Sequence, residues 1–171
     1  MTLPRQIRGA ACGALLLVFA AGLLAAPGPG DTPPPDVGRD MEGDPVLLTN
    51  FAGKAVVVTF WATWCQYCLK ELPILERIQT KAGKDHIEVI AVNTEEKDVY
   101  RRASRIMRQA MTLALVSDSR GTAQKAYGVT TIPHMVIIGR DGRILKVHKG
   151  YSEDGLDEIV ADINLALAPP K

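Results

Sequence analysis

Continuous apolar blocks and segments with helical spacing follow one another along this chain. Two blocks rich in β-branched residues, 55–60 and 87–92, predict central strands that are covered on both faces. The other predicted strands are a short edge strand at 45–49 and strands at 113–116, 135–138 and 144–147. The last two flank Asp141-Gly142, a pair typical of a hairpin turn.

Apolar residues recur with the period of a helix between these strands. The helix predicted after Cys65 contains Pro73, which we expect to kink it. Its expected buried stripe consists of Leu69, Leu72, Leu75 and Ile78. Residues 122–127 and 156–167 predict a short helix and a closing helix. The order of elements predicts an α/β fold with a central mixed sheet and helices on both faces.

A further helix is predicted over residues 95–111, and it is rich in arginine. The arginines are Arg101, Arg102, Arg105 and Arg108. Their first interpretation is a solvated helix face, and the second is a docking surface for an acidic partner.

The first 26 residues predict an export segment. Arg5 and Arg8 precede an apolar run over residues 10–26, about 17 residues long, at the lower limit for crossing a bilayer. A cleaved signal peptide and a retained membrane anchor both remain open, and both place the domain outside the cytoplasmic membrane. Residues 27–44, dense in Pro and Gly, predict an extended spacer ahead of a folded domain over 45–171.

Length, charge and cysteine count exclude several classes of protein. The 171 residues suffice for one domain with a core, and a formal net charge of +1 gives no reason to expect nucleic acid as a partner. Of the three cysteines, Cys12 lies in the apolar leader, so the domain holds only Cys65 and Cys68. Two cysteines cannot form a four-Cys zinc site, and Leu69 after Cys68 excludes a c-type haem attachment site.

The spacing of Cys65 and Cys68, where a strand leads into a helix, predicts a redox-active dithiol. Cys65 is expected at the helix N-terminus, where the helix dipole favours the thiolate by about 0.3–1 kcal/mol. This energy lowers a thiol pKa by roughly one unit or less, so hydrogen bonds to the sulfur must supply the remainder. Cys68, one turn further on, is the expected resolving thiol.

Several motifs in order extend this interpretation. They are Phe60-Trp61-Ala62-Thr63-Trp64-Cys65, the segment Tyr127–Pro133 and the segment Ile137–Ile144. Together they resemble the thioredoxin superfamily, and most closely its extracytoplasmic branch of TlpA/ResA/CcmG-type thiol-disulfide reductases. The resemblance covers Pro45 to the C-terminus and implies a thioredoxin-like fold with that branch's insertion at about 95–111.

The resemblance also implies roles for site residues. It assigns Glu71, three residues after Cys68, as the base that assists the resolving thiol. It implies that Pro133 is cis, opposite the disulfide, and that it exposes the backbone of Ile132 to a substrate segment. The residues expected to flank the sulfurs and contact partners are Trp64, Gln66 and Tyr67.

Three positions depart from the pattern of these families. Tyr67 precedes the second cysteine where proline is common, so the reduction potential is left open. Thr59 stands where thioredoxin has a buried Asp, and His134 follows Pro133 where the CcmG type has Glu.

The predicted function is reduction of disulfides in exported proteins, with cytochrome c maturation or metal-site assembly as expected pathways. The dithiol needs no cofactor beyond its own disulfide, and a membrane protein of the DsbD or CcdA type is the expected electron donor. One alternative is a disulfide oxidant or isomerase. Another is a copper chaperone with Cys65, Cys68 and His134 as ligands, since soft ligands suit Cu(I). A redox-silent adaptor is disfavoured by the intact cysteine pair.

Overall fold

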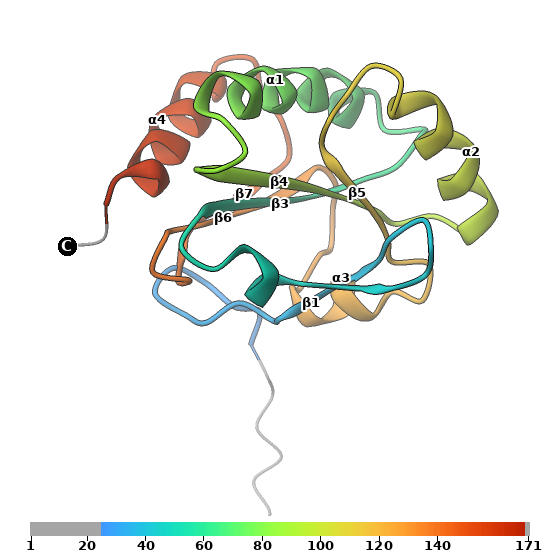
Figure 1. Ribbon diagram of the computed structural model, residues 1–171, viewed down its shortest axis with the longest axis horizontal. Helices are drawn as coiled ribbons and strands as arrows, with labels where there is room; N and C mark the ends of the chain where they lie inside the picture. The colour runs from blue at the N-terminus through green and yellow to red at the C-terminus, as the bar shows by residue number, and fades with distance from the viewer. Residues whose placement is uncertain (1–24, 170–171) are drawn as a thin grey trace, which may run out of the picture.

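The computed structural model describes residues 25–169 as one seven-stranded sheet between two layers (Figure 1). The strands are β1 (Asp36–Arg39), β2 (Pro45–Leu47), β3 (Ala55–Trp61), β4 (Ile87–Asn93), β5 (Ala114–Ser117), β6 (His134–Ile138) and β7 (Ile144–Lys149). The helices are α1 (Gln66–Ala82), α2 (Lys97–Met107), α3 (Thr122–Ala126) and α4 (Leu156–Leu167), with a short 3-10 helix at Leu48–Phe51. Cys12 and most of the predicted export segment lie outside the described residues.

The sheet is mixed, as the sequence predicted, and its strand order is β2-β1-β5-β4-β3-β6-β7. The central strands β3, β4 and β5 are parallel, and the others pair antiparallel. The last residues of the three parallel strands stand in one row, since Trp61 pairs with Asn93 and Asn93 pairs with Ser117. Whatever follows each of these strands therefore meets at the same edge of the sheet.

Two cores sandwich the sheet. Helices α1, α2 and α4 cover one face, and α3 covers the other (Figure 1). Along β3, Val57 and Trp61 belong to the first core, whereas Val58 and Phe60 belong to the second. This double burial explains the unbroken apolar run of the strand, because a strand covered on both faces has no polar side to alternate with.

The predicted spacer over 27–44 is wrong for much of its length, and the folded domain begins before Pro45. Strand β1 lies within it, with Val37 fully buried. A side chain at Gly38 would collide with the backbone carbonyl of Ser117 on β5, so this close strand contact requires glycine. Further upstream, the backbone N–H of Gly30 donates to the carbonyl of Ile144 at 2.8 Å.

Two helices differ from their expected form. Leu69 is exposed, because the buried face of α1 passes through Cys68, Leu72 and Leu75 and leaves Leu69 to one side. Helix α2 is shorter than the predicted 95–111, and its arginines are exposed as expected. Within residues 25–169 no helix combines the length and apolar character needed to cross a membrane.

Tyr127 connects the N-terminal segment to the rest of the domain through a hydrogen bond. Its buried hydroxyl donates to the carbonyl of Pro34 at 2.7 Å, and its ring lies 5.5 Å from that of Phe60. Tyr127→Phe should lower the free energy of unfolding by about 1 kcal/mol, since it removes one hydrogen bond and keeps the ring. Urea unfolding measures the change. Tyr67→Phe, at an exposed ring, is the matched control, and an equal loss in both variants would contradict the fastening role.

Candidate redox site

Cys65 and Cys68 form a disulfide at the start of α1, with their Cα atoms 5.2 Å apart. Cys65 is the N-cap of the helix, and its Sγ accepts a hydrogen bond from the backbone N–H of Cys68 at 3.2 Å. Cys65 is 6% exposed and Cys68 is 1% exposed. Cys65, at the helix N-terminus, is thus the more exposed of the two cysteines.

The turn that leads into Cys65 is held by the loop after β4. The backbone N–H and the hydroxyl of Thr63 donate to the two carboxylate oxygens of Glu95 at 2.6 and 2.8 Å. The side-chain amide of Asn93 donates to the same carboxylate at 3.1 Å, and the backbone N–H of Thr94 donates to the carbonyl of Trp61 at 3.0 Å. Because this loop is tied to both ends of the turn, it fixes where the helix and its first sulfur begin.

Sequence analysis did not identify Glu95 as part of the site. The available signal was the parallel pairing of two predicted buried strands, which brings together the segments that follow them. A carboxylate two residues after the second strand then lies beside the turn after the first.

Glu71 lies in the interior, at 2% exposure, on the same helix as Cys68. The hydroxyl of Thr59 on β3 donates to its Oε1 at 2.8 Å. Burial raises the pKa of Glu71 to about 7, and the hydrogen bond from Thr59 offsets part of that rise. Thr59 therefore partners a carboxylate that α1 supplies, at the strand position where thioredoxin has its own buried Asp.

The peptide bond between Ile132 and Pro133 is cis, as the resemblance implied. Pro133 is buried, and its carbonyl accepts from the backbone N–H of Gly150 at 2.8 Å. Ile132 is half-buried and packs against the core cluster that contains both cysteines. Ile132 also packs against the other core, so the segment lies at the border between the two cores.

Exposed aromatic residues surround the disulfide. Trp64 is 69% exposed and Tyr67 is 57% exposed, and Gln66 between the cysteines is exposed as well. The Tyr67 ring stacks on that of Tyr151 at 5.7 Å, and the Lys70 ammonium lies 5.9 Å from its centroid. Large apolar side chains held at the surface are typical of protein contact sites.

His134 does not lie with Cys65 and Cys68. The alternative prediction of a copper site with these three residues as ligands is therefore wrong. The residue is buried in β6 opposite Phe60, with the two rings edge to face at 6.0 Å. Phe60 belongs to the core on the α3 side, whereas Cys65 and Cys68 belong to the other. Burial lowers the pKa of His134 to about 4, with a further contribution from Lys149. No group of three His, Cys, Asp or Glu side chains within residues 25–169 is placed to hold a metal ion.

Comparisons with known proteins identify the family of this chain. The Redoxin family model matches residues 29–164. The thiol-disulfide oxidoreductase ResA of Bacillus thuringiensis subsp. konkukian is 30% identical over 135 residues, which is 78% of each chain. ResA of Geobacillus thermodenitrificans is 33% identical over 123 residues, covering 71% of this chain and 69% of that protein.

Among solved structures, a Chlorobium tepidum protein described as the thiol:disulfide interchange protein DsbE superimposes with a TM-score of 0.74 at 27% identity. The match covers 84% of this chain and 100% of that one. The predicted thioredoxin-like fold is thereby confirmed. The chain belongs to the Redoxin family and is a thiol-disulfide oxidoreductase.

Proposed function

We propose that this protein reduces disulfide bonds of exported proteins outside the cytoplasmic membrane. The observation that carries the proposal is the Cys65–Cys68 disulfide at the start of α1, with the more exposed cysteine at the N-cap. The reductive direction rests on the resemblance to the TlpA/ResA/CcmG branch. The extracytoplasmic location rests on the basic and apolar character of the first 26 residues.

The reaction begins with both cysteines reduced. The Cys65 thiolate attacks one sulfur of a substrate disulfide, so a mixed disulfide forms and one substrate thiolate leaves. The Cys68 thiolate then attacks Cys65 Sγ and releases the second substrate thiol. Two electrons pass to the substrate, and the protein is left with the Cys65–Cys68 disulfide seen here.

The start of α1 supports the first step. The backbone N–H of Cys68 lies within hydrogen-bond distance of Cys65 Sγ, and the positive end of the helix dipole lies at the same place. Both interactions favour the thiolate over the thiol, and the thiolate is the attacking species.

Glu71 supports the second step. Cys68 is almost fully buried, so its thiol needs a nearby group to take its proton. A carboxylate with a pKa of about 7 changes protonation state near neutral pH, which suits a general base. We assign Glu71 this role on the strength of its burial and of its place three residues after Cys68.

The substrate is proposed to lie against the exposed aromatic residues and the cis-proline segment. Trp64, Gln66 and Tyr67 supply contact area beside the sulfurs, and the backbone of Ile132 supplies polar groups for an extended segment. This arrangement fits a polypeptide substrate better than a small thiol.

Electrons must be resupplied after each turnover, and a membrane donor of the DsbD or CcdA type is the proposed source. Cytochrome c maturation and metal-site assembly are the proposed pathways, again by resemblance. Tyr67 ahead of the second cysteine keeps an oxidant or isomerase as the second candidate function.

Serine substitutions separate the roles of the two sulfurs. Cys68→Ser should accumulate a mixed disulfide with a substrate protein, because no thiol remains to resolve it. Cys65→Ser should trap none, because the accessible nucleophile is gone. Non-reducing electrophoresis after reaction with an exported protein disulfide measures both. Equal trapping by the two variants would contradict the assignment of Cys65 as the attacking sulfur.

The direction of electron flow is tested by the reduction potential of the cysteine pair. A protein without residues 1–24 is equilibrated in thiol/disulfide buffers, and alkylation reports the fraction reduced. A reductase should give a value near or below roughly −270 mV, as thioredoxin does. A value near about −120 mV, the range of DsbA, would replace the reductase with the oxidant.

The role of Glu71 predicts a pH dependence. Below pH 7 this carboxyl is protonated and cannot accept a proton, so decay of the mixed disulfide should accelerate as the pH rises through about 7. Glu71→Gln should slow this step by on the order of 100-fold at neutral pH and remove the acceleration. Rapid quenching with alkylation follows the mixed disulfide.

Two further variants control this experiment. Glu158→Gln, at an exposed carboxylate on α4, should leave the profile unchanged. Thr59→Val removes the hydrogen bond that lowers the pKa of Glu71, so the acceleration should move to higher pH. An unchanged pH profile in Glu71→Gln would show that another group takes the proton.

A further inference from the structure

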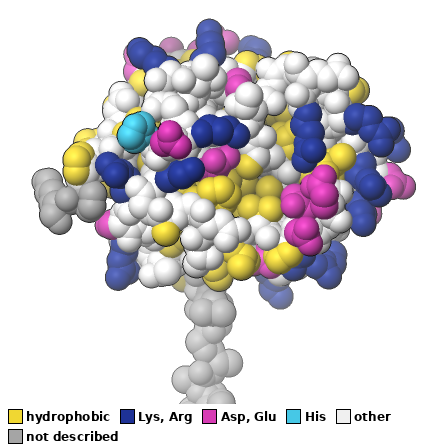
Figure 2. Space-filling model, in the orientation of Figure 1, with side chains coloured by type: hydrophobic (Ala, Val, Ile, Leu, Met, Phe, Trp, Pro, Cys, Tyr) yellow, Lys and Arg dark blue, Asp and Glu magenta, His cyan; other side chains and the backbone are white. Residues whose placement is uncertain are grey.

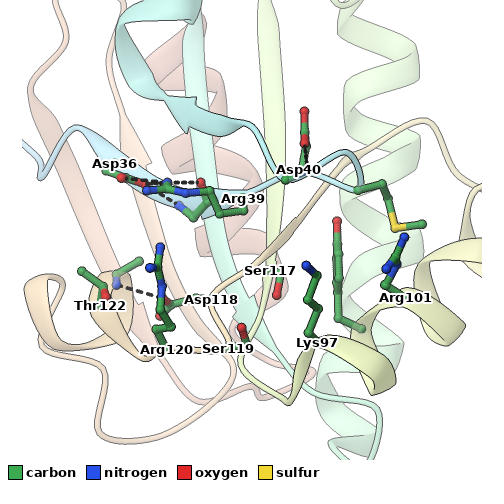
Figure 3. Close-up of a pocket in the computed structure, with 15 residues that line it drawn as sticks. Asp36, Arg39, Asp40, Lys97, Arg101, Ser117, Asp118, Ser119, Arg120 and Thr122 are labelled. Atoms are coloured by element: carbon green, nitrogen blue, oxygen red, sulfur yellow. Dashed lines mark hydrogen bonds and ion pairs between the residues drawn. The ribbon is translucent and has the colours of Figure 1, made fainter.

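A cavity of about 340 Å³ lies outside the carboxyl ends of the parallel strands, away from the disulfide itself (Figure 3). Its walls come from the start of α2, from the loop between β5 and α3, and from β1 with the loop after it. Crevices at this edge of an open α/β sheet are common ligand sites, since the loops that follow the strands surround them.

Three of the four basic side chains that line this cavity form no ion pair with residues 25–169, and the fourth, Arg39, is paired with Asp36. Lys97 and Arg101 come from α2, and Arg120 comes from the loop before α3. Figure 3 shows Lys97 between the two arginines in this view. None of the three forms an ion pair within the part of the chain that the structure describes. On the side of the molecule where α2 lies, Lys and Arg side chains are exposed next to a cluster of Asp and Glu side chains (Figure 2).

The acidic residues of the same walls are already engaged. Asp36 accepts from the Arg39 guanidinium at 2.8 Å. Asp118 accepts from two backbone N–H groups at the start of α3, at 3.1 and 2.8 Å. Asp40 accepts from two backbone N–H groups of its own loop, both at 2.8 Å. Once the Arg39–Asp36 pair is set aside, Lys97, Arg101 and Arg120 outnumber the two remaining carboxylates, Asp40 and Asp118, so the walls have a small positive excess.

The polar groups near the floor and rim include hydroxyls, which can donate as well as accept. The hydroxyl of Ser117, a residue 7% exposed, has no hydrogen-bond partner in residues 25–169. Ser119 and Thr122 are exposed at the rim. Lys97 is the first residue of the 11-residue helix α2, so the positive end of that helix dipole lies at the cavity. Unpaired cations beside the start of a helix, with hydroxyls that can donate, suit a carboxylate.

The position of the cavity indicates where that carboxylate comes from. Trp61, Asn93 and Ser117 pair in one row, and neighbouring strands lie about 4.8 Å apart. The floor at Ser117 is thus roughly 10 Å along the sheet edge from the strand end that leads to Cys65. An extended polypeptide advances about 3.3 Å per residue, so about three residues bridge this distance.

We propose that this cavity binds an acidic side chain of the protein that docks at the Cys65–Cys68 disulfide. The inference rests on the proposed function, because it assumes a polypeptide partner at the redox site. It adds a specificity: substrates with Asp or Glu a few residues from the reacting cysteine are favoured, because the cavity floor lies two strands along the sheet edge from the strand that leads to Cys65.

Peptide disulfides test this specificity. Each peptide contains two cysteines joined by a disulfide. The first peptide has Glu about three residues from each cysteine, and the second has Gln at the same positions. Reduced wild-type protein should react faster with the Glu peptide. Lys97→Glu should slow that reaction by roughly fivefold and leave the Gln peptide unaffected. Arg105→Glu on the same helix, exposed and outside the cavity, is the matched control with an equal change of charge.

The neutral 2-hydroxyethyl disulfide separates failure of this inference from failure of the proposed function. Wild type, Lys97→Glu and Arg105→Glu should all reduce it at the same rate. Equal rates of wild type on both peptides, or equal slowing by the two charge reversals on the Glu peptide, would overturn the cavity as a docking site. Failure of wild type to reduce any of these disulfides would count against the proposed function instead.

Binding without turnover gives a second measurement. The Glu peptide with both cysteines replaced by Ser should shift the backbone NMR signals of Lys97, Ser119 and Arg120 in the oxidised protein. The Gln peptide should shift them less. If inorganic phosphate shifts these signals and the Glu peptide does not, the cavity is a site for free anions and the proposal is wrong.

Discussion

The parallel, in-register pairing of β3 with β4 is the constraint on which the functional edge of this protein depends. It runs without interruption from Ala55 opposite Ile87 to Trp61 opposite Asn93. Because both strands are covered on both faces, a shift of one residue would move every apolar side chain to the wrong core. The end of β3 is thereby fixed beside the end of β4, and Glu95 can reach the turn that precedes Cys65.

The buried carboxylate of Glu71 works against stability. With a pKa of about 7 in the folded chain and about 4.5 when exposed, it binds more protons folded than unfolded between these values. The free energy of unfolding therefore falls as the pH rises through this window, and the cost above pH 7 is on the order of 3 kcal/mol. Thr59 offsets only part of it. A group this costly within the helix of the redox pair favours the proposed role in proton transfer over a role in packing.

Most of the fold could be predicted because β3, β4 and the helices of the first core have strong local patterns. The same holds for Cys65, Cys68 and the cis Pro133, which lie within short motifs. The prediction of a spacer over residues 27–44 was wrong because the structure of this segment depends on contacts distant in sequence. Strand β1 has a four-residue pattern with a glycine, so its burial comes from β5 rather than from its own composition.

The predictions for His134 and Leu69 were wrong because each side chain points away from the face that the sequence pattern indicated. His134 follows Pro133 directly, and proximity in sequence predicted proximity to the cysteines. Successive side chains of a strand point to opposite faces, however, so His134 packs against Phe60 in the far core. Leu69 illustrates the same limit on a helix, since α1 turns toward the sheet the face that contains Cys68 and Glu71.

The basic residues of α2 also show what the sequence pattern can predict and what depends on contacts distant in sequence. The arginines of α2 were interpreted as a solvated face, and most of that face is exposed. Arg101 nevertheless shares a cavity with Lys97 from the helix start and with Arg120 from beyond β5. A net charge of +1 hides this arrangement, because the acidic residues of the same walls bond to their own backbone or to Arg39. Overall charge balance therefore gives no reason to expect long-range attraction of an acidic protein, and it still permits local selection of one carboxylate at this edge of the sheet.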